Sequence, residues 1–206
     1  MLTLYGVYRS RASRNIWLAN ELGIPFKQVP IIQHYRLKEP IPADVVHTKS
    51  PEFLKVNPNG HIPSMDDDGL VLHESLAINL YLAKKHGGAL APANVAEDGE
   101  MGMWSLWAVT EVEAQALSIA QNGATDAALA ALRGPFAVLE KALAKTGYLV
   151  GGRLTVADVN VAEIVRYAQG ATSLFDAAPK VKAWYAACVG RPAYRKMWEM
   201  RDKEPA

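Results

Sequence analysis

The sequence predicts a protein of two parts, an α/β N-terminal part followed by an all-α C-terminal part. Two observations carry this prediction. Up to about residue 88, short alternating segments typical of strands take turns with apolar residues at helical spacing, and beyond it only helical spacing recurs. The chain has 206 residues, half of them hydrophobic, which suffices for one large or two small domains. We predict an α/β domain of residues 1–86, a linker of residues 87–96 and a helical domain of residues 97–206.

The first elements form a compact strand, helix and strand. Residues 2–6 alternate as a short strand, and residues 14–22 carry apolar side chains at helical spacing up to Gly23 and Pro25, which end the helix. Residues 26–32 predict a second strand. Because the connection is a single helix, the two strands are expected to pair in parallel through a right-handed crossover.

The rest of the α/β part contains a short helix, a hairpin and a longer helix. At residues 50–54 a serine cap precedes a proline at the first helical position, which predicts a short helix. Residues 62–66 and 70–73 flank the turn signal Asp67-Asp68-Gly69 and predict an antiparallel hairpin. The helix that follows runs from Ser75 to the glycine pair after residue 86. The predicted order is therefore βαβ-α-ββα.

Only helices are predicted in the C-terminal part. Apolar residues recur at helical spacing in four windows, residues 97–120, 125–145, 179–189 and 192–200. Between the second and third windows, Thr155 and Asp158 stand three positions apart before an apolar run, and this spacing predicts a capping box. We interpret both residues as structural.

Composition narrows the classes of function. A formal net charge of +1 with 21% charged residues disfavours binding to nucleic acid or to a membrane surface, and no apolar run approaches membrane-spanning length. The only cysteine, Cys188, allows neither a disulfide framework nor a cysteine metal site, and the histidines have no metal-ligand spacing. We expect a cytoplasmic protein without a metal.

The segment around Ile62-Pro63 is the most informative part of the chain, together with Glu74-Ser75. An apolar residue before a buried proline suits a cis peptide bond, and such a turn leaves the backbone groups of Ile62 free to pair with a guest. Ser75 stands where a helix N-cap is expected, and a helix start offers N–H donors to an anion. With the Glu74 carboxylate beside it, the site matches the α-ammonium and α-carboxylate of an amino acid.

Taken together, these motifs resemble the glutathione transferase family over nearly the whole chain. The likeness is nearest to the zeta-like or bacterial serine-type classes. It is carried by Leu4-Tyr5, Ser10 and Ser13, Ser50 to Phe53, Asn57-Pro58, Ile62-Pro63, Glu74-Ser75 and Leu154 to Asp158. The resemblance implies a thioredoxin-like N-terminal domain, a helical C-terminal domain, a homodimer, and glutathione as co-substrate without a metal.

The resemblance also assigns roles at the ligand site. The family's cis-proline corresponds to Pro63, its backbone partner for the cysteinyl part of glutathione to Ile62, and its pair for the γ-glutamyl part to Glu74 and Ser75. In some serine-type classes a lysine or glutamine before this turn contacts the ligand, and here that position is His61.

Ser10 is the predicted activator of the glutathione thiol. A thiol pKa of about 8.5 leaves roughly 3% thiolate at pH 7, and a hydroxyl that donates a hydrogen bond to sulfur favours the charged form. Ser10 follows the first strand at the start of the first helix, where the helix dipole assists. Tyr5 and Ser13 are rival hydroxyls, and Ser10 is alternatively only a capping residue. The segment is most similar to the zeta-type Arg-Ser-Ser-Cys-Ser pattern, with Arg11 and Ala12 in place of its second serine and its cysteine.

The predicted function is transfer of glutathione to a hydrophobic electrophile, as a detoxifying enzyme. Trp104, Trp107 and Tyr8 are candidates for an apolar wall, although a spacing of three residues makes the two tryptophans more typical of a core. Two alternatives stay open at this point: a non-catalytic docking module of the same fold, and a zeta-type glutathione-dependent isomerase. The isomerase is disfavoured by the missing cysteine.

Overall fold

The computed structural model describes residues 1–204, which form two compact units. The first consists of Met1–Leu82 together with the chain from Pro192 onward, and the second is Ala83–Arg191. The sequence-based division follows chain order, so it assigns the last helix to the C-terminal part. Residues 205 and 206, which the predicted helical domain includes, lie outside the described residues.

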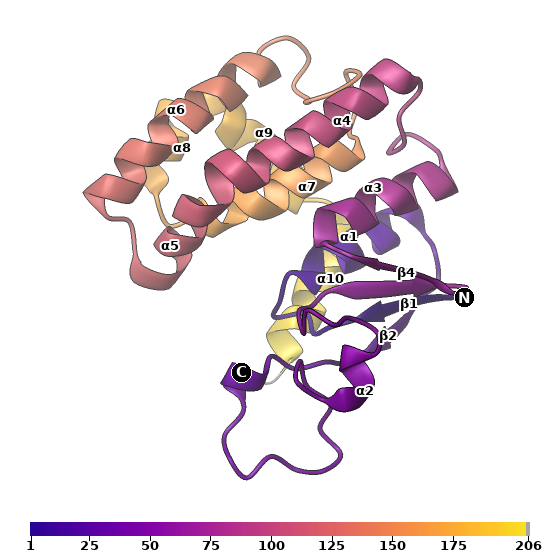
Figure 1. Cartoon of the computed structure of the whole chain (residues 1–206). Coiled ribbons are helices and arrows are strands. Elements are labelled where there is room, and N and C mark those ends of the chain that lie inside the picture. The colour runs from indigo at the N-terminus through magenta and orange to yellow at the C-terminus, as the bar shows by residue number, and fades with distance from the viewer. Residues whose placement is uncertain (205–206) are drawn as a thin grey trace. The chain divides into compact units, whose positions relative to one another are not determined.

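The first unit is built on a four-stranded sheet with the order β2-β1-β3-β4 (Figure 1). β1 (Leu2–Tyr5) pairs in parallel with β2 (Lys27–Val29), as predicted. β3 (Ser64–Asp67) pairs antiparallel with both β1 and β4 (Leu70–His73), which confirms the hairpin. Its turn holds Asp68 at φ 51° and Gly69 at φ 95°, the left-handed pair that two-residue hairpin loops require.

The second strand is shorter than predicted, because residues 26–32 contribute only Lys27–Val29 to the sheet. Pro30 ends it, since proline cannot donate to the ladder. A 3₁₀ turn at His34–Arg36, which the sequence pattern did not indicate, follows in the connection to α2 (Pro51–Leu54). Ser50 does precede α2, but its hydroxyl accepts a hydrogen bond from the amide of His47 at 2.9 Å instead of capping the helix.

Helices complete the first unit. α1 (Ala12–Leu22) ends at Gly23, which adopts a left-handed φ of 65°. α3 (Ser75–His86) follows the hairpin, and its residues up to Leu82 belong to this unit. α10 (Pro192–Lys203) starts where predicted, continues one turn further, and packs along α1 (Figure 1). The contact is aromatic: Trp17 meets Tyr194 edge to face at 5.0 Å between ring centroids, and Tyr194 stacks on Trp198 at 5.6 Å.

The second unit consists of helices, as predicted for the C-terminal part. They are α4 (Val95–Trp107), a π-helical segment (Ala108–Glu113), α5 (Ala114–Asn122), α6 (Asp126–Leu143), α7 (Val156–Val165), a 3₁₀ turn (Arg166–Ala168), α8 (Thr172–Ala177) and α9 (Pro179–Val189). The predicted long helix from residue 97 is thus continuous but changes its hydrogen-bond pattern midway. The 3₁₀ turn and α8 were not predicted.

α7 is the centre of the second unit, since all of its residues are buried. Its start confirms the predicted capping box of Thr155 and Asp158. One carboxylate oxygen of Asp158 accepts from the amide and the hydroxyl of Thr155 at 2.8 and 3.0 Å. The other accepts from the Leu149 amide at 3.1 Å and from the Trp184 indole N–H at 2.9 Å. The residue therefore joins α7, α9 and the segment before α7.

The predicted linker, residues 87–96, is also fixed within the second unit. Arg153 donates to the carbonyls of Ala89 and Ala91 and forms a two-oxygen ion pair with Glu97. The hydrogen bonds from Arg153 lower the pKa of Glu97 to about 2. Within residues 1–204, none of the helices combines the length and apolar character needed to cross a membrane.

Candidate active site

The Ile62-Pro63 peptide bond is cis, as the sequence predicts, and it leads directly into β3. The buried amide of Asn57 fixes the turn from inside, because it donates to the His61 carbonyl at 2.8 Å and to the Ser64 hydroxyl at 3.1 Å. Neither the N–H nor the C=O of Ile62 hydrogen-bonds to another group within residues 1–204. A short stretch of backbone is thereby left available to a peptide-like guest.

Glu74 lies between β4 and α3 with a left-handed φ of 66°, which is rare for a residue with a side chain and marks functional sites more often than chance. Its carbonyl accepts the first helical hydrogen bond, from the amide of Ile78 at 2.9 Å, so Glu74 occupies the N-cap position. Its side chain is exposed and forms no hydrogen bond or ion pair with a described residue. A carboxylate is thus held at a helix N-terminus without a hydrogen-bond or ion-pair partner among the described residues.

Ser75 is the first residue of α3, so its prediction as the N-cap was wrong by one position. The backbone conformation of Glu74, which a sequence pattern does not reveal, shifts the cap. The Ser75 hydroxyl instead accepts a hydrogen bond from the guanidinium of Arg14 at 3.1 Å. Arg14 is 1% exposed, and its positive charge adds to the N-terminal end of the α3 dipole. The two together favour an anion at Ser75.

A buried amide network joins α1 to the start of α3. The side-chain N–H₂ of Asn15 donates to the Ser75 carbonyl at 2.8 Å and to the Asn79 side-chain oxygen at 2.7 Å, and Asn79 donates to the Arg14 carbonyl at 3.2 Å. Arg14, Asn15 and Asn79 were not predicted as site residues from the sequence. A signal was present, since Arg14 and Asn15 interrupt the apolar run of a helix that is buried from Ala12 to Ala19.

The loop after β1 lies beside the cis-proline turn. Tyr5 pairs with Ser64, so the next residue, Gly6, reaches the turn. A side chain at Gly6 would place its Cβ 2.8 Å from that of Ala12 and 3.4 Å from that of Ile62, and the φ of Gly6 is 143°. Glycine therefore permits the close approach. The loop that carries Ser10, the Ile62 turn and the start of α3 are held by neighbouring elements of one unit.

Ser10 is half-buried and engaged in two local hydrogen bonds. Its hydroxyl donates to the Val7 carbonyl at 2.6 Å and accepts from the amide of Ala12, the first residue of α1, at 3.0 Å. The N-cap of α1 is the next residue, Arg11, so Ser10 stands one position before the cap. A hydroxyl has one proton to donate. A bound sulfur can receive that proton only by taking the place of the Val7 carbonyl.

The rival hydroxyls differ in access. Ser13 is 0% exposed, which keeps a ligand away from its hydroxyl. Tyr5 is half-buried at the end of β1, and burial, assisted by the charge of Asp66, raises its pKa. Its phenol therefore stays protonated and keeps a proton to donate. The exposed ring of His61 has no partner among the described residues.

The tryptophans lie in the second unit, where Trp104 meets Trp107 edge to face at 5.1 Å. Trp104 is 9% exposed and belongs to the core, and Trp107 is half-buried. The core interpretation therefore applies to Trp104. No cluster of three potential metal ligands occurs within residues 1–204.

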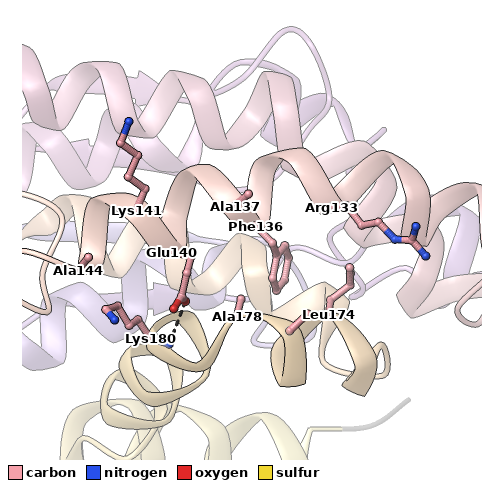
Figure 2. A pocket seen from close by; sticks show the side chains of 10 residues that line it. Arg133, Phe136, Ala137, Glu140, Lys141, Ala144, Leu174, Ala178 and Lys180 are labelled. Carbon is pink, nitrogen blue, oxygen red and sulfur yellow. Dashed lines mark hydrogen bonds between the residues drawn. The ribbon is translucent and has the colours of Figure 1, made fainter.

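A hollow of about 480 Å³ lies between α6, α8 and α9 of the second unit. Phe136, Leu174 and Ala178 line its apolar side, and the carboxylate of Glu140 caps α9 by accepting from the Lys180 and Val181 amides at 2.9 and 3.0 Å. Figure 2 shows Lys141 pointing away from Lys180, so the cations of the rim do not converge on one point. None of the predicted site residues contributes to this hollow.

Fold and site together define a two-domain protein whose thioredoxin-like domain presents a cis-proline turn beside a helix N-terminus. The sequence matches the domain family described as "Glutathione S-transferase, N-terminal domain" over residues 4–90 and the family "Glutathione S-transferase, C-terminal domain" over residues 109–192. The chain belongs to the glutathione S-transferase family.

Curated relatives and solved structures agree with this assignment. The chain is 34% identical to glutathione S-transferase 1 of Zea mays, over 95% of each chain, and 34% identical to glutathione S-transferase 1 of Triticum aestivum, over 77% of this chain and 81% of the relative. Glutathione transferase F7 of Populus trichocarpa superposes with a TM-score of 0.80 at 26% identity, covering 98% of this chain and 99% of that one. Glutathione S-transferase I from maize, in complex with an atrazine glutathione conjugate, gives 0.81 at 28% identity and 99% coverage of both.

Proposed function

We propose that this enzyme joins the thiolate of glutathione to a hydrophobic electrophile. The observation that carries the proposal is the unpaired backbone of Ile62 beside an exposed Glu74 at the N-terminus of α3. These groups offer, within one unit, strand-like hydrogen bonds for a peptide, an acid for an ammonium group and N–H donors for a carboxylate. The γ-glutamyl end of glutathione is a free amino acid head of this kind.

Each site residue then has a role. Ile62 pairs with the cysteinyl backbone of glutathione, and the cis bond of Pro63 keeps the Ile62 groups available. Glu74 binds the α-ammonium, and the Ser75 hydroxyl, polarised by Arg14, binds the α-carboxylate. His61 is exposed next to the turn and contacts the ligand from outside.

Glu74→Gln is expected to weaken glutathione binding by about 10- to 100-fold, because a charge-assisted hydrogen bond is worth about 1.5–3 kcal/mol. Titration calorimetry measures the change. Glu100→Gln is a matched control, since Glu100 is an exposed acid of the second unit without a hydrogen bond to a described residue. An affinity of the Glu74 variant equal to that of the control would remove Glu74 from the ammonium site.

Two measurements test the function itself. Retention on immobilised glutathione reports the ligand, and conjugation of glutathione to chlorodinitrobenzene, an activated aryl chloride, reports the chemistry. A docking module without catalytic function would fail the second test, and this result would contradict the proposal.

We place the enzyme among serine-type transferases, with the zeta-like and bacterial classes as the nearest by local motif. A zeta-type isomerase is the alternative within this group. It is disfavoured because Arg11 and Ala12 replace the second serine and the cysteine of that motif, and the only cysteine of the chain, Cys188, is buried in the second unit. Assay with a cis-trans diketo acid separates the two activities. A homodimer in the cytoplasm completes the proposal, and light scattering of the purified protein tests its oligomeric state.

A further inference from the structure

The loop that carries Ser10 is held by the end of the chain. Two consecutive amides of this loop, those of Tyr8 and Arg9, donate to the two carboxylate oxygens of Glu204 at 2.9 and 2.7 Å. Almost two hundred residues separate Glu204 from Tyr8 and Arg9 in the sequence. All three residues belong to the first unit. One carboxylate thus fixes the direction of two successive peptide groups immediately before Ser10.

The carbonyls of the same two residues are also bound from outside the loop. Arg201 donates to the Tyr8 carbonyl, and Arg36 donates to the Arg9 carbonyl at 3.2 Å. The Arg9 side chain returns a hydrogen bond to the Arg201 carbonyl at 3.2 Å. Every backbone donor and acceptor of Tyr8 and Arg9 therefore has a partner in another element. A loop with this many external bonds has one conformation imposed on it.

The end of α10 is a firm support for these bonds. Trp17, fully buried in α1, contacts Tyr194, which stacks on Trp198. The guanidinium of Arg201 lies over the Trp198 ring at 5.1 Å. An aromatic column thus connects the core of the unit to Arg201, and Glu204 follows one turn later. The support is built from side chains that the glutathione-binding groups do not use.

Activation of a thiol by a hydroxyl depends on its position to within about 0.5 Å. The local bonds of Ser10, to Val7 and Ala12, orient the hydroxyl relative to the loop, and they do not fix where the loop lies. The hydrogen bonds from the loop backbone to Glu204, Arg201 and Arg36 fix the position of the loop. Loss of the Glu204 bonds is thus expected to move the serine while leaving the turn at Ile62 and the start of α3 in place.

We propose that Glu204 is a positioning residue for Ser10: its carboxylate binds the Tyr8 and Arg9 amides and sets the place of the serine hydroxyl for the conjugation reaction. This role rests on the proposed function, because it concerns the serine that activates glutathione. It assigns a role in the reaction to the residue directly after α10. None of the proposed glutathione-binding residues lies in this segment.

The experiment compares Glu204→Ala and Glu204→Asp with Glu199→Ala in the full chain. Glu199 is an exposed acid on the same helix without a hydrogen bond to a described residue, so it controls for charge and helix content. We expect kcat with chlorodinitrobenzene to fall about tenfold in Glu204→Ala, since a misplacement of about 1 Å can cost up to 100-fold. Glutathione affinity by calorimetry stays within about twofold of wild type, because the Glu204 carboxylate hydrogen-bonds to the Tyr8 and Arg9 amides and to no glutathione-binding residue. Glu204→Asp, which keeps the carboxylate, recovers part of the rate, and Glu199→Ala matches wild type.

Hydrogen exchange gives a second, activity-independent result. The amides of Tyr8 and Arg9 are expected to exchange faster in Glu204→Ala than in wild type and in Glu199→Ala, with the amides of β3 unchanged. If the alanine variant unfolds, Glu204→Gln serves in its place, because it keeps one acceptor oxygen and turns an N–H₂ group toward the other amide.

The outcomes separate the two proposals. An unchanged kcat in Glu204→Ala, with an active wild type, would overturn the positioning role alone. A parallel loss of kcat and glutathione affinity would overturn it as well, since it would show a general structural effect. A wild type that binds glutathione without conjugating it would overturn the proposed function, whatever the exchange rates of the two amides.

Discussion

Replacement of Ser10 by alanine is expected to lower the thiolate fraction of bound glutathione about 25-fold at pH 7, with a loss of conjugation rate of the same order. A hydroxyl that lowers the thiol pKa by about two units, from about 8.5 to about 6.5, makes roughly three-quarters of the ligand thiolate, compared with roughly 3% without it. The ratio of thiolate fractions between wild type and the variant rises toward about 100 below pH 6. It falls to about 1 above pH 9, where glutathione is ionised on both proteins. Ultraviolet absorbance of the bound thiolate, followed from pH 5 to 9, measures the shift directly. Glutathione affinity near pH 9 stays close to that of wild type, because Glu74 and Ser75 are untouched.

Matched variants distinguish Ser10 from its rivals. Ser10→Thr keeps a hydroxyl and is expected to retain much of the pKa shift, while Ser10→Ala also loses the hydrogen bond to the Ala12 amide, worth about 1 kcal/mol of stability. Ser13→Ala and Tyr5→Phe are expected to leave the thiolate absorbance unchanged, the first because Ser13 is fully buried. Loss of the absorbance in Tyr5→Phe and its retention in Ser10→Ala would assign the role to Tyr5.

The features predicted correctly are those set by residues close together in the chain. The hairpin follows from Asp68-Gly69, which accept the left-handed backbone of its turn. The capping box follows from Thr155 and Asp158, three positions apart. The cis bond follows from an apolar residue before Pro63. In each case the local chemistry and the tertiary structure favour the same conformation.

The features that sequence reasoning missed depend on partners far apart in the chain. The left-handed φ of Glu74 has no signal in the sequence, since glutamate has no preference for this conformation. The bond from Arg14 to Ser75 joins residues 61 positions apart, and the bond from Tyr8 to Glu204 joins residues 196 positions apart. Helical periodicity identifies α10 and does not reveal that it returns to α1.

Asp158 is a buried support of the second unit, because four donors converge on its two carboxylate oxygens. Burial raises the pKa of its carboxyl, and the hydrogen bonds from Thr155, Trp184 and Leu149 lower it less than burial raises it. The protonated form is therefore held more tightly in the folded chain than in the unfolded chain. By linkage, its contribution to stability is largest below the ordinary aspartate pKa of 3.8 and declines as the pH rises through the folded value.

Asp158→Ala is accordingly expected to lower the free energy of unfolding by about 3–5 kcal/mol, because the buried donors of Leu149, Thr155 and Trp184 lose their acceptor. Asp158→Asn is also destabilising, since its N–H₂ group faces donors. Urea unfolding at pH 4 to 7 measures both effects, with Asp44→Ala as the exposed control, which forms no hydrogen bond with a described residue. The decline in stability with rising pH that Asp158 causes is expected in wild type and in Asp44→Ala, and to be absent from both Asp158 variants. A loss below about 1 kcal/mol in Asp158→Ala would mean that water replaces the carboxylate as acceptor and that the capping box is dispensable for the helical unit.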